Sequence, residues 1–469
     1  MHFNFKSLFS TLFCNKNGVE KQSVFSVTTS IGTVRLFSLF IPMFVSSITN
    51  NLIGTINTAV LSGYSETAVA ATGTTNTLIS LFDILFLVIG TGASVTISNY
   101  IGAERLKKAS NTCYTAIIVC SLLGIICSII FLGLSYPLIS AMNLKGEVLT
   151  EAVTYFRIRI ALLVIPALTS SLSAIIQCYG YPKYTVIAGI ASIVCNLILN
   201  IIVVYFPRYS PVKGVAGIGI SSVISQVVSL AIILFYFKKL KIAILRPSCI
   251  KDFLNYVGKI LKIGIPSGFS SGSFTLSQVI TTSFVANIGV FALSAKVYFT
   301  NILCYAYLFS MNIGNANAIL IGRLVGAKNF EQAKLLNRKL VKITMAVNAV
   351  ISVIIILLRK PLLSLFTENK SIIELSLVIF LVDLLIEQAR AVSHVYEYSL
   401  RAAGDTLFTM IVVVASCWCC SVGLAYFFSI SCNFGLVGCW IGLAIDETIR
   451  SIATYFRWRS NKWTVLNLK

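Results

Sequence analysis

Long apolar stretches constrain the fold of this chain more than any other feature. Each holds roughly the 20 residues that an α-helix needs to cross a bilayer. Strands of a membrane β-barrel would be about ten residues long with alternating polarity, so we predict an all-α integral membrane protein. The twelve predicted spans are residues 33–61, 68–98, 112–140, 150–178, 183–206, 214–237, 255–286, 290–322, 336–358, 372–401, 405–430 and 434–456.

The composition and the distribution of charge agree with this interpretation. Of the 469 residues, 57% are hydrophobic and 11% are charged, whereas soluble proteins have about a quarter charged residues. The net charge of +21 does not indicate a nucleic-acid partner, because most Lys and Arg fall in the termini and in the loops on one side. This positive-inside bias predicts that both termini are cytoplasmic. The first residues lack the pattern of a cleaved signal peptide.

The second half of the chain repeats the first at a constant offset. The aligned pairs include Ile41-Pro42 with Ile265-Pro266, Ile89-Gly90 with Ile313-Gly314, Gly102-Ala103 with Gly326-Ala327, and Gly180 with Gly404. Each copy has six spans, so both enter the membrane in the same direction. We therefore predict two six-helix lobes related by a pseudo-two-fold axis along the membrane normal, with a cavity between them. The predicted divisions are a tail (1–32), an N-lobe (33–237), a basic linker (238–254), a C-lobe (255–456) and a second tail (457–469).

The tenth predicted span carries ionisable residues at helical spacing. They are Asp383, Glu387, Arg390, His394, Glu397 and Arg401. Such spacing places them on one face of a helix, and a charge at mid-bilayer costs about 2.5–3.5 kcal/mol, so the face should line the interior of the C-lobe. Two interpretations are open. Glu387 and Arg390 neutralise each other and hold the lobe together, or Asp383 or Glu387 exchanges a proton or Na⁺ under the influence of Arg390 and Lys296.

Other polar residues and two prolines lie inside predicted spans. Lys296 has no acid close in sequence, so we expect a partner from another helix, the tenth span first, unless it extends to the membrane interface. Asp83 is the only acid deep in the second span, and is either a proton carrier or a structural acid. Pro42 and Pro266 are expected to bend their helices or, near a terminus, to start them.

The last predicted span carries charges that we interpret as structural, and the cysteines suggest no metal site. Asp446 and Arg450 are spaced for an i,i+4 ion pair, with Glu447 beside them. The 13 Cys and two His show no spacing suited to a metal. We expect the cysteines to act as small apolar packing residues.

Several separated segments resemble the MATE (multidrug and toxic compound extrusion) family, in its bacterial branch. They include IPMFVSSITNNLIGTINTAVLSGYSETAVAATG, ISNYIGAERLKKAS, QCYGYPKYT, LIGRLVGAKNFEQAK, LRAAGDTLF and GLVGCWIGLAIDETIR. The resemblance implies a multi-pass exporter of the bacterial inner membrane that exchanges H⁺ or Na⁺ for a small organic or drug-like compound by alternating access. It implies no cofactor beyond the coupling ion, no enzymatic activity, contact with the lipid bilayer, and function as a monomer.

The N-lobe departs from the pattern of that family. The family usually has an acid where this chain has Asn57, and often an acid where it has Asn200, four residues after Asn196. An amide can coordinate Na⁺ but carries no titratable proton. We therefore predict that ion coupling depends more on Asp383 and Glu387 than on the N-lobe.

Two other functions compete with antiport. One is a flippase for lipid-linked precursors, from the same superfamily. A strongly basic central cavity and spans beyond twelve would favour it, whereas the mixed acidic and basic cavity predicted here does not. A multispan enzyme is disfavoured because the chain has no HExxH motif and no acidic metal-binding cluster in a loop.

Overall fold

The computed structural model describes residues 24–62, 66–142, 146–206, 212, 214–367 and 369–465. Long helices dominate this part of the chain. The N-terminal half contains α2 (Leu36–Ser62), α3 (Glu66–Gly102), α4 (Leu106–Gly133), α5 (Ser135–Ser140), α6 (Gly146–Ala161), α7 (Val164–Cys178), α8 (Pro182–Tyr205) and α9 (Gly214–Lys239). The C-terminal half contains α10 (Ile250–Ile288), α11 (Val290–Gly326), α12 (Phe330–Leu357), α13 (Arg359–Ser364), α14 (Lys370–Ala402), α15 (Thr406–Ser416), η1 (Cys417–Leu424), η2 (Phe427–Ser431), α16 (Gly435–Arg459) and η3 (Lys462–Thr464).

These helices match the predicted spans. Among the described residues, six helices are individually long and apolar enough to cross a membrane, and the pair α6 and α7, bent by 49°, adds a seventh. The other five predicted spans correspond to α2, α10, α11, α14 and α16. Polar residues interrupt the apolar sequence of α14 and α16, and most of these polar residues, including Asp383, Glu387, Glu447 and Arg450, are buried inside the protein.

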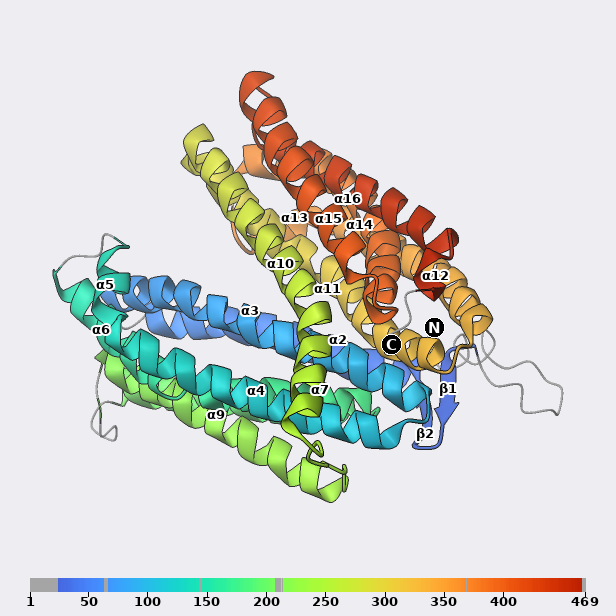
Figure 1. Cartoon of the computed structure of the whole chain (residues 1–469). Helices are drawn as coiled ribbons and strands as arrows, with labels where there is room; N and C mark the ends of the chain where they lie inside the picture. The colour runs from blue at the N-terminus through green and yellow to red at the C-terminus, as the bar shows by residue number, and fades with distance from the viewer. Residues whose placement is uncertain are drawn as a thin grey trace, which may run out of the picture.

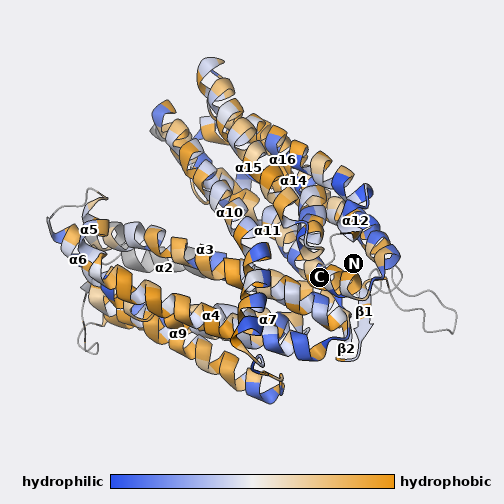
Figure 2. Cartoon of the chain, viewed as in Figure 1, coloured by the Kyte–Doolittle hydropathy of each residue, from blue (hydrophilic) through white to orange (hydrophobic). Residues whose placement is uncertain are grey.

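The helices form two lobes that meet along α2 and α3 on one side and α10 and α11 on the other. Figure 1 shows the two bundles side by side near the termini and diverging toward the ends that carry α5 and α13. Figure 2 shows apolar residues covering the outer faces of α4 and α9, as expected for surfaces in contact with lipid. The arrangement confirms the predicted fold class.

A β-hairpin precedes the first long helix and was not predicted. Its strands β1 (Ser26–Thr29) and β2 (Gly32–Arg35) pair antiparallel, with Val27 opposite Val34. Both valines are buried in a cluster that also contains residues of α11 and α12. The hairpin therefore occupies residues that the sequence analysis divided between a tail and the first span, and the first span begins only at Leu36.

The two prolines lie inside helices, so they are not helix starters. Pro42 is in the second turn of α2, and Pro266 is near the middle of α10. Each removes one hydrogen bond of its helix, at the lobe interface where bending would change the contact between the lobes. Their role in bending remains a prediction. The eleventh span contains a π-helical segment, η1, and such segments are frequent at functional sites.

Candidate functional site

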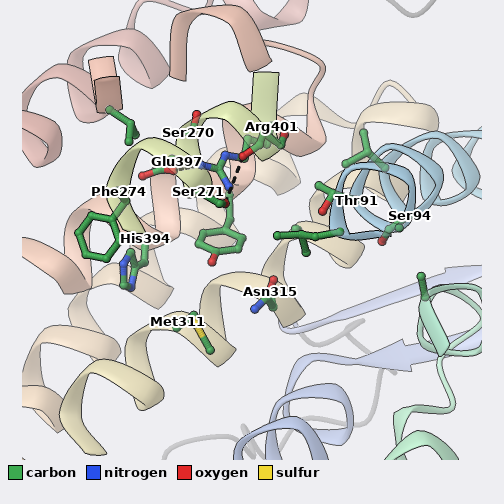
Figure 3. Close-up of a pocket in the computed structure, with 18 of the residues that line it drawn as sticks. Thr91, Ser94, Ser270, Ser271, Phe274, Met311, Asn315, His394, Glu397 and Arg401 are labelled. Atoms are coloured by element: carbon green, nitrogen blue, oxygen red, sulfur yellow. Dashed lines mark hydrogen bonds and ion pairs between the residues drawn. The ribbon is translucent and has the colours of Figure 1, made fainter. Parts of the chain in front are cut away.

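A cavity of about 590 Å³ lies between the lobes, as predicted from the repeat. Figure 3 shows Thr91 and Ser94 of α3 on one side and His394, Glu397 and Arg401 of α14 on the other. The N-lobe wall carries hydroxyl and amide groups without charge, whereas the C-lobe wall carries both signs of charge. The polar residues of the C-lobe wall also include Ser270, Ser271, Tyr307, Asn315, Tyr398, Glu447 and Arg450.

The charged face of α14 is buried, as predicted. Asp383 is 3% exposed and Glu387 is 0% exposed, while Arg390, His394 and Glu397 are also buried. The packing of α14 against α11, α12 and α16 encloses this face. Arg401, one turn further, pairs with Glu397 at the edge of the cavity.

Arg390 is the centre of a buried ion network. Its Nη1 donates to Glu387 Oε1 at 2.6 Å, and its Nε donates to Glu447 Oε1 at 3.2 Å. The guanidinium also lies over the ring of Tyr307, 5.0 Å from the centroid. The pairing of Glu387 with Arg390 was one of the two predicted interpretations. The pairing with Glu447 was missed, because it joins two helices that are distant in sequence.

Arg450 extends the network on α16. It pairs with Asp446, as predicted, with its Nε donating to Oδ1 at 2.9 Å. Arg450 also donates to Ser416 Oγ and to Cys417 Sγ at the start of η1. Glu447, interpreted from sequence as structural, in fact lines the central cavity together with Arg450. Cys417 therefore has a polar contact, as does the buried Cys178, whose Sγ lies 3.1 Å from Ser94 Oγ.

Asp383 and Lys296 line a second pocket, of about 240 Å³, inside the C-lobe. The ammonium group of Lys296 donates to Thr282 Oγ1 of α10 at 2.8 Å and forms no ion pair with a described residue. The expectation that its bonded partner comes from the tenth span was therefore wrong. The tenth span nevertheless contributes Asp383 and Arg390 to the walls of the same pocket.

Three buried oxygens around this pocket and the ion network have no hydrogen-bond partner among the described residues. They are Asp383 Oδ2, Asn348 Oδ1 and Ser352 Oγ. Asn348 contacts Glu387, its Nδ2 lying 3.2 Å from Oε2. Because α12 and α14 run antiparallel, Ser352 lies one turn further along α12 toward Asp383. Oxygen ligands of this kind suit a proton or a hard cation.

The balance of buried charges also favours binding of a proton or a cation at this site. Among the described residues, the carboxylates of Asp383, Glu387, Asp446 and Glu447 outnumber the two guanidinium groups of Arg390 and Arg450. Lys296, which lines the pocket of Asp383, offsets one more charge. A buried carboxylate without a counter-ion is costly. The site therefore has the capacity to take up at least one proton or cation.

His394 lines the central cavity together with Glu447 and Arg450 of the network. Its ring packs edge-on against Tyr307 and Tyr398, with centroids 5.6 and 6.0 Å away. Its Nδ1 has no hydrogen-bond partner in the described part of the chain. The imidazole can therefore donate or accept a hydrogen bond toward a molecule in the cavity.

No ion pair joins two described residues of the N-lobe, whereas several lie in the described part of the C-lobe. Asp83 is exposed, and no hydrogen bond to it is seen among the described residues; Arg159 lies close enough to interact electrostatically. Leu87, one turn along α3, lines the cavity, so Asp83 faces the space between the diverging lobes. Asn200 donates to Asn196 Oδ1 at 3.1 Å. The side chain of Asn57 lies outside the described residues.

Comparisons with known proteins give one consistent result. The family model MatE matches residues 42–202 and 266–427, one segment in each lobe. The chain is 34% identical over 448 residues to the uncharacterized transporter YisQ of Bacillus subtilis, covering 94% of this chain and 98% of YisQ. It is 24% identical over 429 residues to the probable multidrug resistance protein NorM of Thermotoga maritima, covering 91% and 92%.

Solved structures share the fold. One is the outward-facing conformation of a multidrug resistance MATE family transporter of the MOP superfamily, with a TM-score of 0.83 and 21% identity, covering 91% of this chain and 95% of that one. Another is a MOP superfamily transporter from Pyrococcus furiosus, with a TM-score of 0.81, 21% identity and the same coverage.

Proposed function

Because the chain belongs to the MATE family of membrane transporters, we propose that it is a secondary antiporter that exports small organic compounds in exchange for H⁺ or Na⁺. Both termini lie in the cytoplasm of a bacterial cell, and the inner membrane holds the protein. The central cavity holds the exported compound. The pocket of Asp383 holds the coupling ion.

One observation carries this proposal. Asp383 is buried without an ion pair among the described residues, its Oδ2 has no hydrogen-bond partner, and it lies on the same helix as Glu387. A carboxylate in this position changes its interactions when it gains a proton or Na⁺. Glu387 contacts Arg390, and Arg390 contacts Glu447, which lines the central cavity. The network therefore provides a physical route by which ion binding alters the cavity wall.

The same route explains why ion and compound would alternate. A ligand shifts a two-state equilibrium only by the difference between its affinities for the two states. An ion bound at Asp383 changes the negative charge near Arg390. It therefore changes how strongly Arg390 pairs with Glu447. Glu447 in turn offers more or less negative charge to the compound in the cavity.

The test is transport by the purified protein in proteoliposomes with an imposed H⁺ or Na⁺ gradient. A panel of cationic, anionic and zwitterionic compounds supplies the substrate. Asp383→Asn and Glu387→Gln remove charge while preserving shape, and each should abolish gradient-driven transport by a folded protein. The gradient that drives transport by the unsubstituted protein identifies the ion.

Glu374→Gln is the matched control, because Glu374 is an exposed carboxylate on the same helix. This variant should transport at the normal rate. Gradient-driven transport by the Asp383→Asn and Glu387→Gln double variant at the normal rate would refute the assignment of the coupling site to the C-lobe. Asp83 would then be the next carboxylate to substitute.

A further inference from the structure

The lobes make a close contact where α3 and α11 end, near the termini of the chain. A Cβ atom added to Gly102 would lie 1.9 Å from the backbone oxygen of Arg323, and one added to Gly326 would lie 2.0 Å from that of Asn99. Gly102 and Gly326 are equivalent positions in the sequence repeat, and at the same offset Asn99 is equivalent to Arg323. The two helices therefore cross with their backbones in contact, and the crossing follows the pseudo-two-fold symmetry.

The side chains at this crossing reach into the opposite lobe. Asn99 Nδ2 donates to the backbone oxygen of Ala402 at 2.9 Å, and Arg323 Nη2 donates to the backbone oxygen of Cys178 at 2.7 Å. Cys178 and Ala402 are again equivalent in the repeat. The two hydrogen bonds are thus the same contact, made once in each direction between the lobes.

Both acceptors are carbonyl groups at helix ends. Cys178 is the last residue of α7, and Ala402 is the last residue of α14. The last carbonyls of a helix have no partner within it, and neither oxygen accepts from a described backbone N–H. Asn99 is 7% exposed and Arg323 is 0% exposed. Each side chain therefore gives a hydrogen bond to the last carbonyl group of a helix in the opposite lobe.

The β-hairpin strengthens the contact at the same end. The Ser30 amide donates to Glu104 Oε1 of the N-lobe at 2.9 Å. Arg323 Nη1 donates to Thr29 Oγ1 at 3.3 Å, and Gln332 Nε2 donates to the backbone oxygen of Ser26 at 3.3 Å. The hairpin is thus bonded to both lobes.

We propose that Asn99 and Arg323 are positioning residues of the transport cycle, forming a symmetric pair of latches that seal the termini-bearing end of the central cavity. Separation of the lobes at this end breaks both hydrogen bonds and leaves both carbonyl acceptors to water. The latches then favour the state that is closed here and open at the opposite end. This inference concerns the conformational equilibrium and does not depend on the identity of the ion or the compound.

The experiment measures the distance between the lobes with spin labels at Lys107 and Glu331. These residues are exposed, equivalent in the repeat, and located in different lobes at the sealed end. The labelled protein, with the exposed Cys249 and Cys419 replaced by Ser, is studied in lipid nanodiscs by pulsed electron–electron double resonance. We expect a mainly short distance without further substitution.

Asn99→Ala and Arg323→Met should each raise the ratio of long to short distances by about tenfold or more, since each removes a buried hydrogen bond that exists only in the sealed state. Arg323→Lys keeps a charged donor and should have a smaller effect. If Arg323→Met fails to insert into the membrane, the test rests on Arg323→Lys together with Asn99→Ala.

The matched control is Asn317→Ala. Asn317 is also buried on α11, but its side chain donates to Asn337 Oδ1 and Ser399 Oγ within the C-lobe. This variant should lose stability without a change in the distance ratio. The proposal is overturned if the Asn99 and Arg323 variants keep the original distribution, or if Asn317→Ala shifts it equally.

Discussion

Substitution of Arg390 by Met tests how much the buried network contributes to the stability of the C-lobe. Met replaces the aliphatic part of the Arg side chain but has neither the guanidinium group nor its charge. Arg390 donates to Glu387 at 2.6 Å and to Glu447 at 3.2 Å, and both carboxylates are at most 1% exposed. The variant therefore leaves two buried carboxylates facing each other without the cation between them.

The magnitude follows from this geometry. Removing one member of a buried ion pair costs about 3–5 kcal/mol, because an uncompensated charge stays behind. Glu447 keeps a second cation, since Arg450 Nη1 lies 3.8 Å from its Oε1, whereas among the described residues Glu387 keeps only the amide of Asn348. Most of the loss should therefore come from Glu387. Adding Glu387→Gln to Arg390→Met should recover about half of it or more.

The assay is the free energy of unfolding in mixed micelles, titrated with a denaturing detergent and followed by tryptophan fluorescence. Four proteins form a double-mutant cycle: the unsubstituted chain, each single variant and the double variant. The reasoning is refuted if Arg390→Met loses less than about 1 kcal/mol, or if the effects of the two substitutions simply add.

Three further outcomes follow from the geometry of the sealed end and of the linker. Gly102→Ala should destabilise that end, because the new Cβ would lie 1.9 Å from the backbone of α11; Gly133→Ala, with open space around it, should be neutral in the same thermal-unfolding assay. Hydrogen bonds from the Ser30 hydroxyl and from the Ser30 amide lower the pKa of Glu104. The stability that these bonds add is therefore present above the unfolded pKa of about 4.3 and is lost as the pH falls through the lower folded value. The protection factor of the Ser30 amide, which is its intrinsic exchange rate divided by the observed rate, should fall over that acidic range, and Glu104→Ala should show a low protection factor at every pH. The exposed Cys249 should react with an impermeant maleimide in inside-out vesicles; labelling in intact cells that Cys249→Ser abolishes would reverse the predicted topology.

The sequence predicted the fold because the relevant signals are local and periodic. Apolar length identified the spans, and the repeat identified the lobes and the cavity between them. The charged face of α14 was predicted for the same reason, because residues three and four apart share one face of a helix. The pairing of Asp446 with Arg450 is likewise a contact within one helix.

Contacts between distant helices could not be predicted in this way. Glu447 of α16 pairs with Arg390 of α14, and Asn348 of α12 contacts Glu387 of α14. Their sequences show only polar residues in apolar surroundings, which indicates burial but not a partner. The hairpin was missed because two four-residue strands, Ser26–Thr29 and Gly32–Arg35, give a weak alternating pattern beside a long apolar helix.

The repeat also shows how two copies of one unit take different roles. At the sealed end the copies have kept the same geometry, and Asn99 and Arg323 make equivalent contacts although their side chains differ. Deeper in the membrane the copies have diverged in charge, since at the same offset Asp383 of the C-lobe is equivalent to Arg159 of the N-lobe.

A symmetric contact suits a seal, because rocking of one lobe against the other breaks both halves together. A coupling site needs only one lobe to respond to the ion, so asymmetry in charge is compatible with a symmetric movement. If each lobe held an independent coupling site, substitutions at Asp383 and Glu387 would reduce transport only in part; complete loss is the result that this division of roles requires.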